Sequence, residues 1–432
     1  MSLRSHPTLN LKRFFADLNY FPHAGQQLVH RSTARRRVVS CGVRWGKSLC
    51  AAMEAIAAAM LADGRSIGWI VAPTYDLADR IYREVELRLM EHMRHRIVSR
   101  KESERRIVIR NISGGLSEIR AKSADNPDSL LGEGLDFVIV DEASRLKPRI
   151  WQSFLSQRLI DKDGWALLIS TPKGKGYFYD LYRMGQGEDR DPDYESWNMP
   201  SWSNPLLDRK LIDAERARLP ERVFAQEFGA QFIEGSGSVF RGVRECATST
   251  WSKPLPRERY LAGLDLGKTE DFTVLTILDS HCRLVHYDRF HRQDWAIQTQ
   301  RIKAALDRYG ATVLVDSTGA GEPILEGLKR DGVNAYPYPF TMQSKTALID
   351  NLSLLFEKRE ILLPRPELWP EGIDELESFQ YSVNDNGYAR MSAPSGQHDD
   401  IVISLALAAW HVRTRIVQVR LTCFPRRRRR FI

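Results

Sequence analysis

The sequence predicts an α/β protein of at least two domains. Its 432 residues are too many for one compact hydrophobic core. In both halves of the chain, short apolar runs that suit buried strands alternate with helical patterns, an order typical of α/β layers. Residues 234–242 (EGSGSVFRG) have the glycine and serine content of a linker. We therefore expect a domain boundary between residues 234 and 255.

The first half contains four short apolar runs that predict buried parallel strands. They are 36–41 (RRVVSC), 66–73 (SIGWIVAP), 135–144 (LDFVIVDEAS) and 165–172 (WALLISTP). Residues 77–92 predict an amphipathic helix, because apolar side chains recur there every four residues. The second half begins with runs at 259–267, 272–279 and 282–290, which are typical of an antiparallel meander.

Composition excludes several classes of protein. Hydrophobic residues make up 43% and charged residues 27%, which is typical of a soluble globular protein. No apolar stretch is long enough to span a bilayer, and the N-terminus lacks the apolar core of a signal peptide. We therefore expect a cytosolic protein with no membrane partner. Five scattered cysteines without Cys-x-x-Cys spacing indicate neither a zinc site nor a disulfide framework.

The net charge of +8 is concentrated at the C-terminus. The last twenty residues hold eight arginines and no acid, so the rest of the chain is close to neutral. The run Arg426–Arg430 predicts a disordered arm. Two interpretations stay open for it, a solvated tail and a segment that contacts nucleic acid or an acidic protein surface.

The stretch CGVRWGKS, residues 41–48, is similar to a phosphate-binding P-loop. Gly46, Lys47 and Ser48 supply the helix N-terminus, the phosphate-binding lysine and the Mg²⁺-binding hydroxyl. The usual first glycine is replaced by Cys41, and Gly42 provides backbone freedom one residue late. The alternative is an ordinary Gly-Lys-Ser turn at the surface.

A pair of acids follows the apolar run FVIV at residues 137–140. In a P-loop ATPase the first acid, Asp141, would hold Mg²⁺. The second, Glu142, would orient and polarise the attacking water. The alternative is that the pair only caps a helix, where negative charge is favoured.

Two weaker signals accompany the loop and the acids. Ser170 and Thr171 end another apolar run, in a place suited to sensing the γ-phosphate. Gln26 precedes the loop by about twenty residues, and its amide has the paired donor and acceptor that can read an adenine edge. A surface glutamine is the equally acceptable alternative.

The second half has acids at the ends of apolar elements and no nucleotide loop. Asp265 ends YLAGLD, Asp316 ends ATVLVD, and Asp399 and Asp400 open the run IVISLALAAW. Acids so placed can converge on two divalent cations that clamp the attacking and leaving oxygens of a phosphodiester. Oxygen ligands suit Mg²⁺ or Mn²⁺ rather than zinc. Each acid alone would indicate a turn or cap residue, but together they predict a metal-dependent nuclease.

The motif order resembles the large terminase subunit of tailed double-stranded DNA viruses. The motifs are CGVRWGKS, VIVDEAS, STP, RVFAQEFGAQF, GLDLG, LVDSTGAG and GQHDDIVISLALA, and they span nearly the whole chain. The resemblance implies an ASCE-type P-loop ATPase domain over residues 1–235, with a lid at about 173–235. It also implies a ribonuclease H-like nuclease domain over 256–418, after a linker at 236–255 and before a basic tail at 419–432.

The resemblance also implies roles for single residues. The ATP and Mg²⁺ contacts would be Gln26, Gly42, Arg44, Gly46, Lys47, Ser48 and Asp141, with Glu142 catalytic and Ser170 and Thr171 coupling hydrolysis to movement. The nuclease metal ligands would be Asp265, Asp316 and Asp399, with Asp400 and Asp271 as accessory acids and His398 orienting a carboxylate.

As for partners, the resemblance implies double-stranded DNA, a portal protein, a small terminase subunit and a homo-oligomeric ring, expected to be a pentamer, on the procapsid in the host cytoplasm. The function would be ATP-driven DNA translocation with metal-dependent cleavage of concatemers. A cellular helicase–nuclease and a non-catalytic DNA-binding scaffold are the alternatives. The chain has little room for the second motor domain of a helicase.

Two positions depart from the family pattern. The family usually has arginine four residues before the lysine, where this chain has Val43, with Arg44 one position late. Relatives often have an arginine before GEG, a candidate finger for the neighbouring subunit, where this chain has Leu131. Such a finger stabilises charge in the transition state. Arg120, Arg145 or Arg149 would replace it, or neighbouring subunits would hydrolyse ATP slowly. Arg44 is a separate candidate for a finger that acts within its own subunit.

Overall fold

The computed structural model describes residues 11–233, 236–267, 272–291, 295–316, 321–383, 389–394 and 397–422. The chain divides into two compact units. The first comprises residues 1–217, 221–235 and 383–389, and the second comprises 218–220, 236–382 and 390–432. Each unit is built on its own sheet, which confirms the predicted α/β class.

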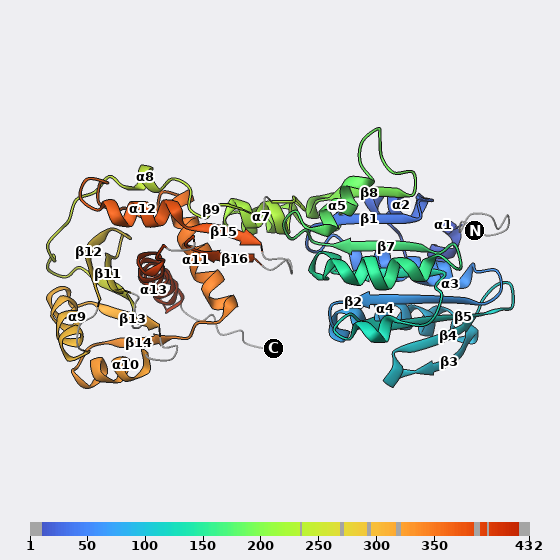
Figure 1. Ribbon diagram of the computed structural model, residues 1–432, viewed down its shortest axis with the longest axis horizontal. Helices are drawn as coiled ribbons and strands as arrows, with labels where there is room; N and C mark the ends of the chain where they lie inside the picture. The colour runs from blue at the N-terminus through green and yellow to red at the C-terminus, as the bar shows by residue number, and fades with distance from the viewer. Residues whose placement is uncertain are drawn as a thin grey trace, which may run out of the picture. The chain divides into compact units, whose positions relative to one another are not determined.

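The first unit contains an eight-stranded sheet of order β3-β4-β5-β2-β6-β7-β1-β8 (Figure 1). The strands from β5 to β8 in this order run parallel, and β3 and β4 pair antiparallel at one edge. Their bounds are β1 Arg36–Cys41, β2 Ser66–Ala72, β3 Ile97–Lys101, β4 Arg106–Arg110, β5 Leu116–Ser123, β6 Phe137–Asp141, β7 Trp165–Ser170 and β8 Tyr194–Met199. The four predicted strands are confirmed as β1, β2, β6 and β7.

The helices of this unit include the predicted amphipathic helix, observed as α4. Their bounds are α1 Leu11–Asp17, α2 Ala24–Arg31, α3 Lys47–Met60, α4 Tyr75–His92, α5 Tyr177–Met184, α6 Arg209–Arg216 and α7 Glu221–Glu227. Short helical turns are η1 Arg94–Arg96, η2 Glu102–Glu104, η3 Pro127–Leu130, η4 Ala143–Arg145, η5 Ile150–Leu155, η6 Ser156–Leu159 and η7 Ser201–Ser203.

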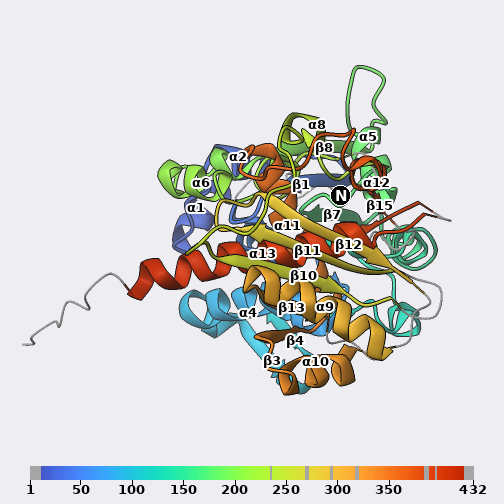
Figure 2. The same cartoon turned by 90° about the vertical axis from the view of Figure 1, so that its left-hand side faces the viewer.

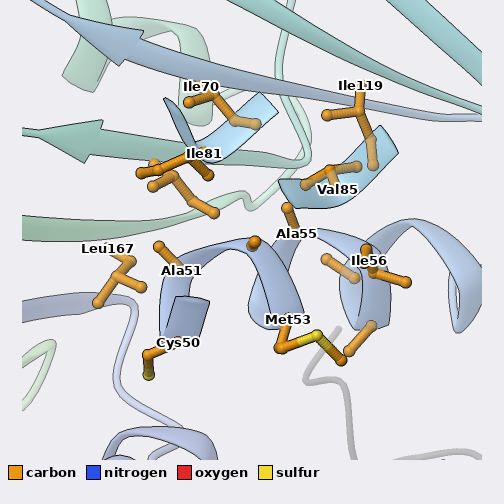
Figure 3. Close-up of a cluster of buried hydrophobic side chains, with 14 of the residues drawn as sticks. Cys50, Ala51, Met53, Ala55, Ile56, Ile70, Ile81, Val85, Ile119 and Leu167 are labelled. Atoms are coloured by element: carbon orange, nitrogen blue, oxygen red, sulfur yellow. The ribbon is translucent and has the colours of Figure 1, made fainter. Parts of the chain in front are cut away.

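Apolar side chains on both faces of the central strands build two cores. On β6, Phe137 and Ile139 face one core, while Val138 and Val140 face the other. The alternation follows from the two-residue period of a strand, and it explains why these strands appear in the sequence as continuous apolar runs. Figure 3 shows the first core, where the alanine-rich helix α3 packs against α4 and the sheet.

The second unit contains a five-stranded sheet of order β12-β11-β10-β13-β14. The predicted meander is confirmed, because β10 pairs antiparallel with β11 and β11 with β12. β13 and β14 then continue the sheet in parallel with β10. The bounds are β10 Tyr260–Asp265, β11 Thr273–Asp279, β12 Leu284–Phe290, β13 Thr312–Asp316 and β14 Ala335–Tyr338. A small sheet joins β9 Ser236–Ser238, β15 Gln380–Val383 and β16 Ala389–Ser392.

Helices cover this sheet on both faces. α9 and α10 contribute to an apolar core on one face, while α13 packs along β10 and β11 (Figure 2). The bounds are α8 Val243–Cys246, α9 Trp295–Tyr309, α10 Gly321–Arg330, α11 Met342–Glu357, α12 Pro370–Ser378 and α13 Asp400–Thr422. α13 extends past residue 418, where we expected the nuclease domain to end. The run Arg426–Arg430 lies outside the described residues.

Gly263 of β10 allows α13 to approach the sheet very closely. A Cβ atom there would lie 2.0 Å from the carbonyl oxygen of Ser404 and 2.6 Å from the amide nitrogen of Ala408. The Ser404 hydroxyl donates to the Gly263 carbonyl at 2.9 Å and lies 2.9 Å from the hydroxyl of Thr276. These contacts fix the position of α13 along β10.

Among the described residues, no helix is long and apolar enough to cross a membrane. Four of the five cysteines lie in the described part of the chain, and all four are free thiols and buried.

Replacing Gly263 with alanine should lower the stability of the second unit by about 1–3 kcal/mol, because the added methyl group must push the backbone of α13 away from β10. Calorimetric unfolding of the full chain measures the loss. Gly327→Ala is the matched control, since no atom lies within 4 Å of its added Cβ and it sits inside α10. An unchanged transition for Gly263→Ala would contradict the close-packing argument.

Candidate functional site

The loop between β1 and α3 has the backbone shape of an anion cradle. β1 ends at Cys41 and α3 begins at Lys47. Gly46 caps the helix with φ of 101°, and Arg44 is also left-handed with φ of 62°. Glycine adopts such angles without strain, which explains its presence at position 46. The turn therefore places the first N–H groups of α3 at the end of the loop, where they can bind an anion.

Four consecutive carbonyl groups of this loop accept hydrogen bonds from side chains outside it. The pairs are Ser201 Oγ to the oxygen of Val43 at 2.6 Å, Asn204 Nδ2 to that of Arg44 at 3.0 Å, His23 Nε2 to that of Trp45 at 3.1 Å, and Gln26 Nε2 to that of Gly46 at 3.2 Å. In a trans peptide the C=O and the following N–H point in opposite directions. Holding these oxygens outward therefore turns the N–H groups of Arg44, Gly46 and Lys47 toward the inner side, where phosphate oxygens would bind. The N–H of Trp45 instead donates to the carbonyl of Gly42 at 3.3 Å.

The glycine at position 42 has a packing reason. A Cβ atom on Gly42 would lie 2.4 Å from Ser201 Oγ and 2.5 Å from the carbonyl oxygen of Phe228. Its N–H donates to the carbonyl of Met199 at 2.9 Å. Cys41, where the family's first glycine would stand, is the fully buried last residue of β1. Gly42 thus allows the loop to pack closely against residues 199–201.

Gln26 lies directly beside the loop and is almost fully buried. Its Nε2 donates to the carbonyl of Gly46, and its Oε1 accepts the N–H of His23 at 3.2 Å. His23 carries its proton on Nε2, because a carbonyl oxygen only accepts, and burial lowers the pKa of its imidazole. Gln26 therefore joins α2 to the loop; its reading of adenine stays a prediction.

The acidic pair lies at the end of β6. Asp141 is the last strand residue, and Glu142 adopts a left-handed conformation with φ of 49°. Asp141 Oδ1 accepts the N–H of Glu142 at 3.0 Å. Burial and the neighbouring Glu142 raise the pKa of Asp141 to about 7, against the lowering effect of Lys47. A strained backbone and a perturbed carboxyl group at the same place are typical of a functional site.

Two cations lie beside the Glu142 carboxylate. Lys47 Nζ is 3.5 Å from Glu142 Oε1, and Arg145 Nε is 3.6 Å from Glu142 Oε2. Burial opposes the charge of Lys47, but Cys41, Glu142 and Asp141 outweigh it and raise its pKa. The lysine also donates to Thr171 Oγ1 at 3.4 Å. The structure thus brings Lys47, Glu142 and Thr171 together, as the sequence predicted them to act on one nucleotide.

The C-terminal end of β7 lies between the segment after Asp141 and Glu142 and the P-loop residue Lys47. β7 lies between β1 and β6, so Ser170 and Thr171 stand beside both the P-loop and the acids. Ser144 Oγ is 2.8 Å from Ser170 Oγ and donates to the Thr171 carbonyl at 2.8 Å. The buried hydroxyl of Ser144 thus joins the segment after Glu142 to the end of β7.

A second link runs from residue 173 to the loop. Lys173 forms an ion pair with the side chain of Glu227 at the end of α7. The carbonyl of Glu227 in turn accepts the N–H of Val43 at 2.7 Å. The segment after β7 and α7 are thus joined to the loop.

The acids of the second unit lie around one end of its sheet. Asp265 ends β10 and Asp316 ends the neighbouring parallel strand β13, while Asp400 begins α13, which packs on β10. The pKa of Asp265 is raised well above its ordinary value, first by burial and then by the charges of Asp400, Asp316 and Asp399. The structure therefore brings together the acids that the sequence predicted to act together, except Asp271, which lies outside the described residues.

These carboxylates have cationic and polar neighbours. Lys345 Nζ of α11 is 3.2 Å from Asp399 Oδ2, and His398 Nδ1 is 3.5 Å from Asp400 Oδ2. Asp400 Oδ2 also accepts the N–H of Phe272 at 3.3 Å. Within the described ranges, no three His, Cys, Asp or Glu side chains are gathered closely enough to hold a metal ion. Asp400, Asp316 and Asp399 are nevertheless close enough to Asp265 for their charges to raise its pKa.

Comparison with known proteins identifies the family. The family model described as "Terminase large subunit, T4likevirus-type, N-terminal" matches residues 38–245. The large terminase subunit of Thermus virus P23-45 is 37% identical over 434 residues, which cover 92% of this chain and 88% of that protein. The chain belongs to the large terminase subunit family. The large terminase subunit of Escherichia phage T5 is 27% identical over 58% of this chain and 59% of its own length.

A large terminase from another thermophilic bacteriophage shares the fold of the whole chain. Its structure aligns with a TM-score of 0.56 at 13% identity, covering 92% of this chain and all of that one. At this identity the likeness concerns fold alone.

The structure distinguishes the arginines that could replace the terminase finger. Leu131 is half exposed, and Arg120 lies on β5 paired with Trp69 of β2. The guanidinium of Arg149 lies 5.6 Å from the centre of the Phe154 ring. Of the three candidates at 120, 145 and 149, the one that forms an ion pair with Glu142 is Arg145.

Several residues that support the two sites through hydrogen bonds or ion pairs were not predicted from the sequence. Most of them lie more than twenty residues from the motif they contact, and serine, asparagine and lysine are common on surfaces. They are His23, Ser144, Lys173, Ser201, Asn204, Glu227, Lys345 and Glu375. The motif RVFAQEFGAQF was a partial signal, because Glu227 lies within it.

Asn204→Ala should weaken nucleotide binding about fivefold, because it removes one hydrogen bond that holds the Arg44 carbonyl outward. Fluorescent ADP binding to the full chain measures the change. Asp208→Ala is the control, since Asp208 caps α6 in the same segment, where its side chain accepts the N–H of Lys210. Equal affinities for wild type and Asn204→Ala would show that the loop keeps its shape unaided.

Proposed function

We propose that this terminase hydrolyses ATP in its first unit to translocate double-stranded viral DNA into a procapsid, and cuts concatemeric DNA in its second unit. The observation that carries the proposal is the placement of Lys47, Glu142 and Thr171 at one end of the first sheet. The loop with its outward carbonyls supports nucleotide binding beside them. The four acids at the end of the second sheet support the nuclease.

In the first unit, the loop N–H groups and Lys47 would bind the phosphates of ATP. Ser48, in the first turn of α3, and Asp141 would hold Mg²⁺, which neutralises charge on the phosphates. Glu142 would accept a proton from the attacking water or orient it. Lys47 would leave Glu142 for the phosphates when the nucleotide binds. Ser170 and Thr171 would sense the change and pass it to the rest of the unit.

In the second unit, Asp265, Asp316 and Asp399 would hold two Mg²⁺ or Mn²⁺ ions, with Asp400 and Asp271 as accessory acids. The donor set fits these ions, because it consists of carboxylate oxygens at one end of the sheet, and oxygen ligands suit Mg²⁺ and Mn²⁺. The ions would activate the attacking water and stabilise the leaving oxygen. Lys345, 3.2 Å from Asp399 Oδ2, would balance the charge of that ligand.

We also propose that Arg145 takes part in the charge stabilisation that Leu131 cannot supply. The support is its ion pair, within the same subunit, with Glu142, the proposed catalytic residue. Arg44 remains the second candidate: its exposed side chain projects from the loop itself, at a left-handed residue. The partners would be DNA, a portal protein and a small terminase subunit, with a pentameric ring at the procapsid in the host cytoplasm.

The two activities should separate in single variants of the full chain. Glu142→Ala should bind ATP but lose hydrolysis, whereas Asp316→Asn should lose DNA cleavage in Mn²⁺ or Mg²⁺ and keep hydrolysis. Measuring ATPase and cleavage on each preparation checks the division. Cleavage retained by Asp316→Asn, or ATPase lost from it in a folded protein, would contradict the proposal. Translocation along intact duplex distinguishes a packaging motor from a helicase.

Arg145→Ala should lower kcat for ATP about tenfold or more, with little change in nucleotide affinity, because charge develops mainly in the transition state. Arg149→Ala is the matched control, since that arginine lies on the same segment against Phe154. Steady-state kinetics and fluorescent nucleotide binding give the two constants. A loss of affinity at unchanged kcat would show instead that Arg145 binds the ground state.

A further inference from the structure

Glu375 of α12 is a buried acid that neither proposed activity uses. It is 8% exposed, and burial raises its pKa to about 7 in spite of the hydrogen bonds it accepts. A carboxyl group removed from water is costly unless its oxygens are bonded. The contacts of the Glu375 carboxylate therefore indicate its role in the structure.

The carboxylate of Glu375 holds the first turn of α13. Its Oε1 accepts the N–H of Ile401 at 2.7 Å and that of Val402 at 3.1 Å. The first N–H groups of a helix have no partner within the helix, so an acceptor from another element fixes the helix end. The carbonyl of Asp399 accepts the N–H of Ile403 at 3.0 Å, which places Asp399 at the helix start. Glu375 thus anchors the turn that carries Asp399 and Asp400.

The other oxygen of Glu375 faces a second chain of contacts to the same acids. Its Oε2 is 3.9 Å from Arg289 Nη1, and the guanidinium of Arg289 lies 3.8 Å from the centre of the Phe272 ring. The N–H of Phe272 donates to Asp400 Oδ2. Glu375 thus contacts the acids in two ways. Its Oε1 holds the main chain at the start of α13, and its Oε2 reaches, through Arg289, the residue Phe272 that binds the Asp400 side chain.

A fixed helix start matters because metal ligands must converge to within a few tenths of an ångström. Gly263 and Ser404 fix where α13 lies along β10, but they contact the helix about one turn further in. Glu375 acts at the end itself, next to Asp399 and Asp400. Removing such a support leaves the ligands present but less well oriented, which typically lowers metal affinity by about tenfold or more.

We propose that Glu375 is a positioning residue for the nuclease metal site, acting through the N–H groups of Ile401 and Val402. This inference rests on the proposed nuclease function. Glu375 is not a ligand in this arrangement, since Oε1 is bonded to the helix and Oε2 faces Arg289. What the site requires from it is a hydrogen-bond acceptor at this point, rather than its charge.

The test is Mn²⁺ binding to the nucleotide-free full chain, measured by calorimetry. Glu375→Ala should weaken binding about tenfold and shift half-saturation of DNA cleavage to higher Mn²⁺, with kcat at saturating metal largely restored. Glu375→Gln keeps a carbonyl oxygen for both N–H groups and should stay close to wild type. Glu377→Ala is the control on the same helix, because Glu377 is exposed and pairs with the exposed Arg244 at 2.8 Å.

The outcomes decide between roles. Unchanged Mn²⁺ affinity for Glu375→Ala would overturn the proposal. An equal loss of Mn²⁺ affinity in Glu375→Gln and Glu375→Ala would also overturn it, because it would show that the site needs the negative charge of Glu375. Should Glu375→Ala not fold, Glu375→Asp takes its place, since it retracts the carboxylate by one methylene; wild-type Mn²⁺ affinity there would equally overturn the proposal. Mn²⁺ binding that Asp316→Asn does not diminish would contradict the nuclease function itself, not the role of Glu375.

Discussion

Both sites depend on a backbone approach that is closer than any side chain would permit. At Gly42 the P-loop lies against Ser201 and the carbonyl of Phe228, and at Gly263 the strand β10 lies against α13. Each contact brings a serine hydroxyl onto a carbonyl oxygen, at Val43 and at Gly263. The two glycines therefore have a different role from the turn-forming Gly46. They determine how closely the segment at Ser201 and Phe228 can approach the P-loop, and how closely α13 can approach β10.

Electrostatic repulsion is the cost of gathering acids, and each site offsets it with cations of its own. Glu142 stands between Lys47 and Arg145, and Asp399 stands beside Lys345. Burial and neighbouring acids still raise the pKa of Asp141 and Asp265, although Lys47 and Lys345 act in the opposite direction. The incoming nucleotide or metal ion would change these pairings directly.

The sequence predicted the α/β class, the strands that carry the motifs and the residues that meet in each site, because apolar runs ending in acids are local patterns. It could not predict the supporting contacts. Ser201 and Asn204 hold a loop some 160 residues away, and Glu375 caps a helix that starts 25 residues later. Nothing in the neighbourhood of a common polar residue shows which distant carbonyl or N–H it will meet. The edge strand β3 was missed for a related reason: it is mostly exposed and charged, and it lacks a continuous apolar run.

The departures of the P-loop from the family pattern follow from this support. Val43 has both backbone groups bonded, its N–H to Glu227 and its carbonyl to Ser201, so position 43 acts as the point where the loop is fastened to residues 199–228. Arg44 follows in a left-handed conformation that costs a non-glycine residue free energy. The bond from Asn204 to its carbonyl offsets part of that cost and leaves the side chain exposed. The side chain of Asn204, 160 residues further along the chain, thus supports the backbone conformation of Arg44 in this loop.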